Sequence, residues 1–272
     1  MEVTERKRNT KRLWLGLAAL PILFLALWLG GREDGPMGVA HYVGYAVCHQ
    51  ITIRTYVFGD LVMPLCARCS GQYLGVMIGF FLAWRWGRIR ATGLPPRWLI
   101  AVLIGFLAIW AFDGFNSYLY LILGRPFLYQ PHNILRISTG IMQGLAVSFL
   151  FLPFFNLAFW TDSDPSPVLQ NRWELAQALG LGVLVVLAVA SGWTILFYPL
   201  AILSVVGTVL MLSLVGALFV LLALREENTN RTVGDFLSLL LPGMAFAALL
   251  LLGIDLFRAF AESSLGMVLP TG

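Results

Sequence analysis

Long apolar segments constrain the fold of this 272-residue chain more than any other feature of its sequence. A helix needs roughly 20 mainly apolar residues to cross the hydrocarbon core of a bilayer. Segments near that length lie at 13–30, 71–86, 98–120, 134–160, 174–192, 199–224 and 236–258. Because lipid cannot satisfy backbone polar groups, each segment is expected to be helical. The sequence therefore predicts an all-α polytopic integral membrane helical bundle of about seven transmembrane helices.

The composition supports a lipid environment and excludes nucleic acid as a partner. Hydrophobic residues make up 59% of the chain and charged residues only 12%, whereas soluble domains are roughly one quarter charged. The net charge is +4, but its positive residues are spread through short connections and form no basic stripe that could follow a phosphate backbone. The principal partner that this composition predicts is the lipid bilayer.

The distribution of lysine and arginine predicts the orientation of the chain, because cytoplasmic loops carry more of them. One set of connections holds 12 of the 18 positive residues: Arg6, Lys7, Arg8, Lys11, Arg12, Arg85, Arg88, Arg90, Arg97, Arg172, Arg225 and Arg231. We therefore expect a multi-pass protein of the cell membrane with a cytoplasmic N-terminus and extracytoplasmic connections at about 31–70 and 121–133. Segment 13–30 could instead be a signal peptide, although Leu29-Gly30-Gly31-Arg32 is a poor cleavage site.

The strongest local signal is a set of three cysteines in the predicted 31–70 connection. Cys48-His49-Gln50 is followed by Pro64-Leu65-Cys66-Ala67-Arg68-Cys69-Ser70-Gly71. The two-residue spacing of Cys66 and Cys69 lets both sulfurs reach one metal ion, and Cys48 adds a third thiolate. A histidine would complete a tetrahedral zinc site, with His49 favoured and His41 as the alternative ligand. The pattern predicts an extracytoplasmic centre for zinc or another transition metal.

Two other interpretations of the cysteines remain open. Cys66 and Cys69 stand where a helix is expected to begin, which lowers a thiol pKa, so the pair could exchange thiols and disulfides and pass electrons to a quinone. The cysteines could equally be a structural disulfide or buried thiols. Covalent haem attachment is disfavoured, because Ser70 stands where a histidine would follow the CxxC pair.

Polar residues within or beside the apolar segments predict an intramembrane pocket, since ionisable groups in lipid are costly. Asp113 lies inside segment 98–120, and Arg136 begins segment 134–160. We expect these two to form an ion pair that either holds two helices in register or lines a ligand pocket. The predicted polar pocket comprises Arg54, Arg68, Asp113, Asn116, Asn133 and Arg136.

Two further patterns predict local structure. Gly71, Gly75 and Gly79 recur every fourth residue, as do Gly140 and Gly144. Small residues at this spacing let helix backbones approach closely in lipid. The apolar character of residues 39–47 predicts an amphipathic helix that lies on the membrane surface.

The strings Cys48-His49-Gln50, Pro64 to Gly71 and Tyr73-Leu74-Gly75, with Asp113-Gly114, Asn133 to Arg136 and Thr139-Gly140, resemble a bacterial and archaeal membrane family. It is the family with the domain of unknown function 2085. The resemblance covers about residues 41–146 and implies that these positions act together, but it implies no activity. It predicts a family-like domain at 1–160 and a three-helix membrane extension at 161–272.

Three functions fit these patterns, and the familiar catalytic motifs do not occur. The first is a zinc-binding membrane protein with a polar pocket. The second is a membrane thiol–disulfide oxidoreductase that uses Cys66 and Cys69, or a metal site acting on a hydrophobic small molecule. The third is a subunit of a larger membrane complex without chemistry of its own. Whether the chain is an enzyme stays open.

Overall fold

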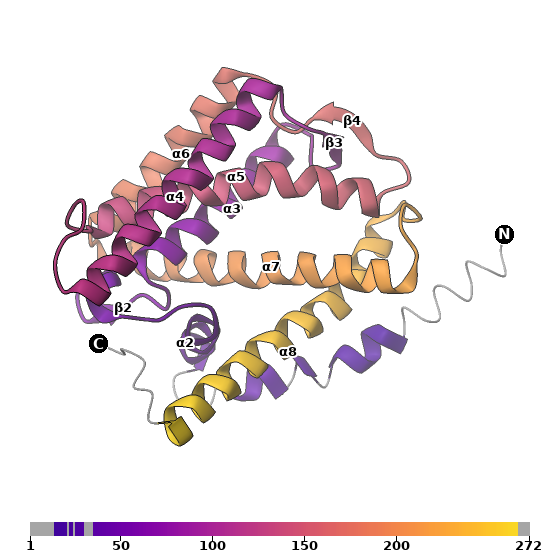
Figure 1. Cartoon of the computed structure of the whole chain (residues 1–272). Helices are drawn as coiled ribbons and strands as arrows, with labels where there is room; N and C mark the ends of the chain where they lie inside the picture. Colours follow the sequence, from indigo (N-terminus) through magenta and orange to yellow (C-terminus); the bar gives the residue numbers. More distant parts are fainter. Residues whose placement is uncertain (1–13, 21, 24, 30–34, 266–272) are drawn as a thin grey trace. The chain divides into compact units, whose positions relative to one another are not determined.

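The computed structural model describes residues 14–20, 22–23, 25–29 and 35–265 (Figure 1). Its main helices are α2 (Gly35–Val47), α3 (Ala67–Arg85), α4 (Arg97–Leu123), α5 (Asn133–Phe159), α6 (Arg172–Ala190), α7 (Phe197–Leu224) and α8 (Val233–Leu265). Short 3-10 turns lie at η1 (Thr52–Arg54) and η2 (Thr194–Leu196). Two short strand pairs interrupt the helices: β1 (Val57–Phe58) with β2 (Leu61–Val62), antiparallel, and β3 (Ala91–Gly93) with β4 (Asp164–Pro167), parallel. The prediction of a helical protein is confirmed.

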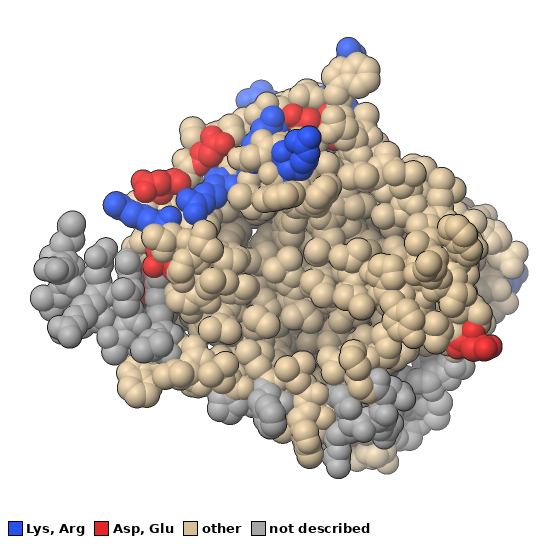
Figure 2. Space-filling model, turned by 180° about the vertical axis from the view of Figure 1, so that it is seen from behind, with Lys and Arg blue, Asp and Glu red and all other residues tan. Residues whose placement is uncertain are grey.

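Five described helices are long and apolar enough to cross a membrane: α4, α5, α6, α8 and α7 with its preceding turn. They match five of the predicted segments. Segment 13–30 lies partly outside the described residues, although 14–20, 22–23 and 25–29 are helical. Charged side chains are few on the described surface drawn in Figure 2 and leave a wide uncharged area, as expected for helices that contact lipid.

Helix α3 corresponds to the predicted segment 71–86, but it is not among the five candidate spans. Arg68, Ser70 and Gln72 in its first turns make it less apolar than the others. Its surroundings explain why this is tolerated, because 12 of its 19 residues are buried. A helix covered by protein does not need the apolar surface that lipid requires.

Glycines allow α3 and α5 to pack with their backbones in contact. A Cβ atom at Gly71 or Gly75 would collide with the backbone of Ile137 or Ile141, and one at Gly144 would collide with the backbone of Gln72. The predicted meaning of the four-residue glycine repeat, close helix packing, is thus confirmed. The contact fixes the start of α3 against the first turns of α5.

Helix α4 shows a division between its two faces. Most of its large apolar side chains are exposed, including Ile109, Phe112 and Phe115. Its buried residues are Leu99, Leu103, Phe106, Asp113, Asn116 and Ser117. The buried stripe is therefore apolar in the first half of α4 and polar in the second half. Gly124 in the left-handed conformation ends the helix (φ 65°).

The described residues divide into two compact units, and the boundary between the units falls within helices α5 and α7. The first unit holds the described residues of 1–47, 155–163 and 208–269, and the second holds 48–154 and 164–207. In the first unit α2 contacts α8, and Arg258 donates a hydrogen bond to the carbonyl of Tyr45. Helix α2 confirms that residues 39–47 are helical, and its predicted place on the membrane surface stays a prediction. The second unit contains all three cysteines.

Candidate metal centre

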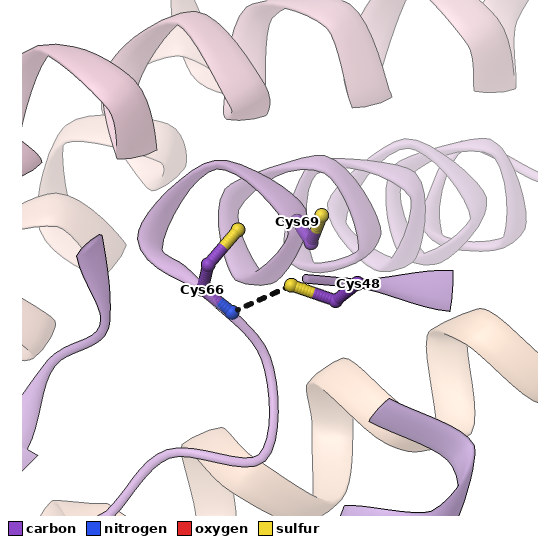
Figure 3. A group of neighbouring side chains, drawn as sticks. All are labelled: Cys48, Cys66 and Cys69. Carbon is purple, nitrogen blue, oxygen red and sulfur yellow. Dashed lines mark hydrogen bonds between the residues drawn. The ribbon is translucent and has the colours of Figure 1, made fainter. Parts of the chain in front are cut away.

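The three cysteine sulfurs lie together at the N-terminal end of α3 (Figure 3). All three Sγ atoms are within 4.8 Å of one another. Cys48 is 4% exposed, and the backbone N–H of Cys66 donates to its Sγ over 3.3 Å. None of the three forms a disulfide. The sequence prediction that Cys48 approaches Cys66 and Cys69 is confirmed.

Local backbone structure brings these distant cysteines together. Helix α2 ends at Val47, so Cys48 follows outside the helix, and Gln50 adopts a left-handed conformation (φ 49°). The Gln50 side chain then donates to the carbonyl of Pro64 over 2.9 Å and joins the two cysteine strings. Cys66 is extended and occupies the N-cap position of α3, which places Cys69 in the first turn.

The three cysteine thiols differ in pKa. Cys48 and Cys69 both donate hydrogen bonds to Cys66, and these bonds hold the pKa of Cys66 well below its usual range despite burial. Backbone N–H groups of Arg68 and Cys69 add to the effect. Donation to Cys66 raises the pKa of Cys48 to about 11. Cys66 is therefore the cysteine of the three that loses its proton most readily, and a thiolate at this position can bind a cation or attack an electrophile.

The histidines are placed differently from the cysteines. His49 is exposed, and the cluster found among the described residues consists of the three cysteines without a histidine. His41 lies within α2, whereas Cys48 follows the end of that helix at Val47. A histidine as fourth ligand stays a prediction.

A buried polar centre lies beside the cysteine cluster and is built around Asp113, which is 2% exposed. Its carboxylate accepts an ion-pair hydrogen bond from Arg68, a hydrogen bond of 2.7 Å from Tyr129 and one of 3.2 Å from Thr139. Arg68 also donates to the Ser117 hydroxyl over 3.0 Å. Since Arg68 lies between Cys66 and Cys69 in sequence, the cysteine cluster and the polar centre share one helical turn.

The predicted ion pair between Asp113 and Arg136 is wrong. Arg136 instead donates to the side chain of Asn133 over 2.7 Å, and no ion pair joins it to Asp113 within the part of the chain described. Both arginines lie in the first turn of a helix, in α3 and α5 respectively. Helical periodicity showed that Asp113 faces inward but could not show which of the two cations it meets.

The other predicted pocket residues also lie in this region. Asn116 donates to the carbonyl of Tyr129 over 3.0 Å and accepts from the N–H of Leu128 over 3.2 Å, so it anchors the connection after α4. Arg54 donates to the carbonyl of Ser117 over 3.3 Å. Burial and the charge of Arg68 lower the pKa of Arg54.

Tyr129 is a polar-centre residue that sequence reasoning missed. Its hydroxyl donates to Asp113, and burial followed by this hydrogen bond raises its pKa to about 12. Tyr129 lies in the short connection between α4 and α5, where a single tyrosine carries no periodic pattern. The one signal available in the sequence was that this short connection directly follows the end of α4 that carries Asp113 and Asn116.

Comparison with known proteins identifies the region that holds both groups. Residues 48–150 match the family described as "Predicted membrane protein (DUF2085)". An uncharacterized protein of Methanothermobacter thermautotrophicus is 30% identical over 107 residues, which cover 38% of this chain and 83% of that protein. The chain belongs to this family. An uncharacterized protein of Methanocaldococcus jannaschii is 28% identical over 120 residues, covering 44% of this chain and 70% of that protein. No solved structure matches.

The DUF2085 region coincides with the functional candidates. Residues 48–150 include Cys48, Cys66, Cys69 and the arginines and aspartate of the polar centre. Helices α6, α7 and α8 lie outside the match. This family member is thus a helical multi-pass membrane protein whose family region carries the cysteine cluster.

Proposed function

We propose that the protein binds a transition metal, most naturally zinc, through the thiolates of Cys48, Cys66 and Cys69. The observation that carries the proposal is the approach of three sulfurs from two separate strings to within 4.8 Å. Zinc–thiolate bonds of about 2.3 Å need sulfurs roughly 4 Å apart, so a small contraction would suffice. Backbone N–H groups of Cys66 and Gln50 that donate to Cys48 would orient the ligand and stabilise its charge.

The fourth position of the metal decides what kind of site this is. A histidine, His49 or His41, would close the coordination and make the zinc structural. Three protein ligands with an open position would instead resemble catalytic zinc, which binds water or a substrate. The centre faces the extracytoplasmic side in the orientation that the loop charges indicate.

Metal analysis of the purified full-length protein tests this proposal. We expect about one zinc per chain, and near-complete loss when any one of Cys48, Cys66 or Cys69 is replaced by serine, because two thiolates hold zinc weakly. His49→Ala, with the exposed His132→Ala as matched control, shows whether His49 is a ligand. Wild-type protein without metal after purification under reducing, chelator-free conditions would contradict the proposal.

A second candidate function is thiol–disulfide exchange by Cys66 and Cys69. The position of Cys66 at the start of α3, with Cys69 one turn on and its sulfur nearby, favours it. The two thiols would form a disulfide and give two electrons and two protons to a quinone, which becomes the quinol. A measurable redox potential for this pair in metal-free protein, lost in Cys69→Ser, would support exchange over metal binding.

A further inference from the structure

Three arginines meet beside the cysteine cluster and are linked through shared partners. Arg54 and Arg68 both donate to Ser117, over 3.3 Å to its carbonyl and over 3.0 Å to its hydroxyl. Arg136 donates to Asn133 over 2.7 Å, and Asn133 donates to the carbonyl of the residue before Arg54 over 3.2 Å. The three guanidinium groups therefore lie in one small region of the second unit.

Positive charge exceeds negative charge in this region. Among the described residues, Asp113 is the one carboxylate that pairs with these three arginines, which leaves two positive charges in excess, and a thiolate at Cys66 nearby would offset only one of them. Arg68 and Arg136 lie in the first turns of α3 and α5, neither of which has an acidic residue in that turn. The helix macrodipole adds positive potential there, so the cations occupy unfavourable positions unless an anion is near.

The arginines also retain unused hydrogen-bond donors. The Nε atoms of Arg54, Arg68 and Arg136 are all buried without an acceptor among the described residues. Arg136 as a whole is 5% exposed. Buried donors without acceptors are costly and uncommon in native proteins. A ligand with several oxygen acceptors and negative charge would accept hydrogen bonds from these Nε donors and would also offset the excess positive charge.

We propose that Arg54, Arg68 and Arg136 form a binding site for a phosphate-type oxyanion, either free phosphate or the phosphate of an anionic lipid headgroup. A tetrahedral phosphate offers more oxygen acceptors than a carboxylate, and arginine binds it in bidentate fashion. The proposal does not require the metal. Zinc with three thiolates would carry one net negative charge, less than the excess of the arginines.

The first test measures binding of inorganic phosphate to the full-length protein in detergent. We expect saturable binding that is about tenfold weaker or more in Arg54→Gln, because a charge-assisted contact is lost. Arg54 is chosen over the more deeply buried Arg136, whose replacement could prevent folding. Arg125→Gln removes the same charge from an exposed position after α4 and is the matched control; it should bind phosphate as the wild type does.

The second test distinguishes a lipid headgroup from free phosphate. The same variants are placed in phosphatidylcholine nanodiscs containing some phosphatidylglycerol, and retained lipid is identified by native mass spectrometry. Selective retention of phosphatidylglycerol that Arg54→Gln reduces and Arg125→Gln does not would assign the site to a lipid. Absence of binding in both tests, or equal loss in the two variants, would overturn the proposal. Zinc content measured on the same samples reports separately on the cysteine centre.

Discussion

At the scale of single residues, Asp113 offers the sharpest energetic test. It is 2% exposed and neutralises Arg68, whose side chain is 18% exposed. Removing one partner of a buried pair leaves the other charge uncompensated and costs roughly 3–5 kcal/mol. We expect Asp113→Ala to lower the free energy of unfolding by about 3 kcal/mol. A shift of the unfolding midpoint in detergent reports this change.

The double variant Asp113→Ala with Arg68→Ala should recover part of that loss, because neither charge is then stranded. Asp60→Ala, at an exposed position in the β1–β2 turn, is the control and should change stability little. Equal destabilisation by the single and double variants would mean that the pair contributes nothing as a pair.

The cysteine cluster and the polar centre differ in how far sequence alone predicted them. Three cysteines within one connection indicate a shared site, so it could be inferred from the sequence that they lie close together. The partner of Asp113 could not, because Arg68 and Arg136 both begin helices near the same end of α4. Which arginine reaches Asp113 depends on the packing of α3 against α5, a tertiary contact that no local pattern encodes.

At the scale of elements, the contact between α3 and α5 positions the whole site. Gly144 on α5 lies against the backbone of Gln72 and Val76, so even a methyl group would force the helices apart. We expect Gly144→Ala to lower the unfolding free energy by roughly 1–3 kcal/mol, the usual cost of overpacking. Thermal unfolding in detergent measures the change.

Gly105→Ala is the matched control, because Gly105 also lies within a helix but a Cβ atom there meets nothing within 4 Å. Alanine favours helix over glycine by up to about 1 kcal/mol, so this variant should be neutral or slightly stabilised. If the two alanine variants behaved alike, the glycine repeat would have no packing role.

The predicted segments correspond closely to α4 through α8, since roughly 20 apolar residues leave the chain few alternatives to a helix. The predicted segments 174–192 and 199–224 are separated where α6 and α7 are, and Gly192 between these helices adopts a left-handed turn conformation (φ 64°). The strand pairs β1–β2 and β3–β4 were not predicted, because strands of two to four residues carry no measurable alternation. Strands β1 and β2 form a hairpin within the α2–α3 connection, whereas β3 and β4 pair where the α3–α4 and α5–α6 connections lie side by side.

At the scale of the whole molecule, the predicted orientation rests on the 12 of 18 lysines and arginines assigned to one side. It predicts that the cysteine centre faces outward and that the connection between α7 and α8 faces the cytoplasm. Two exposed positions, Asp60 in the β1–β2 turn and Glu227 in the connection after α7, allow both sides to be examined in otherwise native protein.

A membrane-impermeant thiol reagent is applied to intact cells that express Asp60→Cys or Glu227→Cys, after chelation and mild reduction. Labelled peptides are then identified by mass spectrometry, which separates each introduced cysteine from Cys66 and Cys69. We expect Asp60→Cys, and more slowly the half-buried native cysteines, to react in intact cells, because lipid does not separate them from the reagent. Glu227→Cys should react only after the membrane is opened. The opposite pattern would reverse the orientation and place the cysteine centre in the reducing cytoplasm, where thiolate–metal binding is more readily maintained than disulfide exchange.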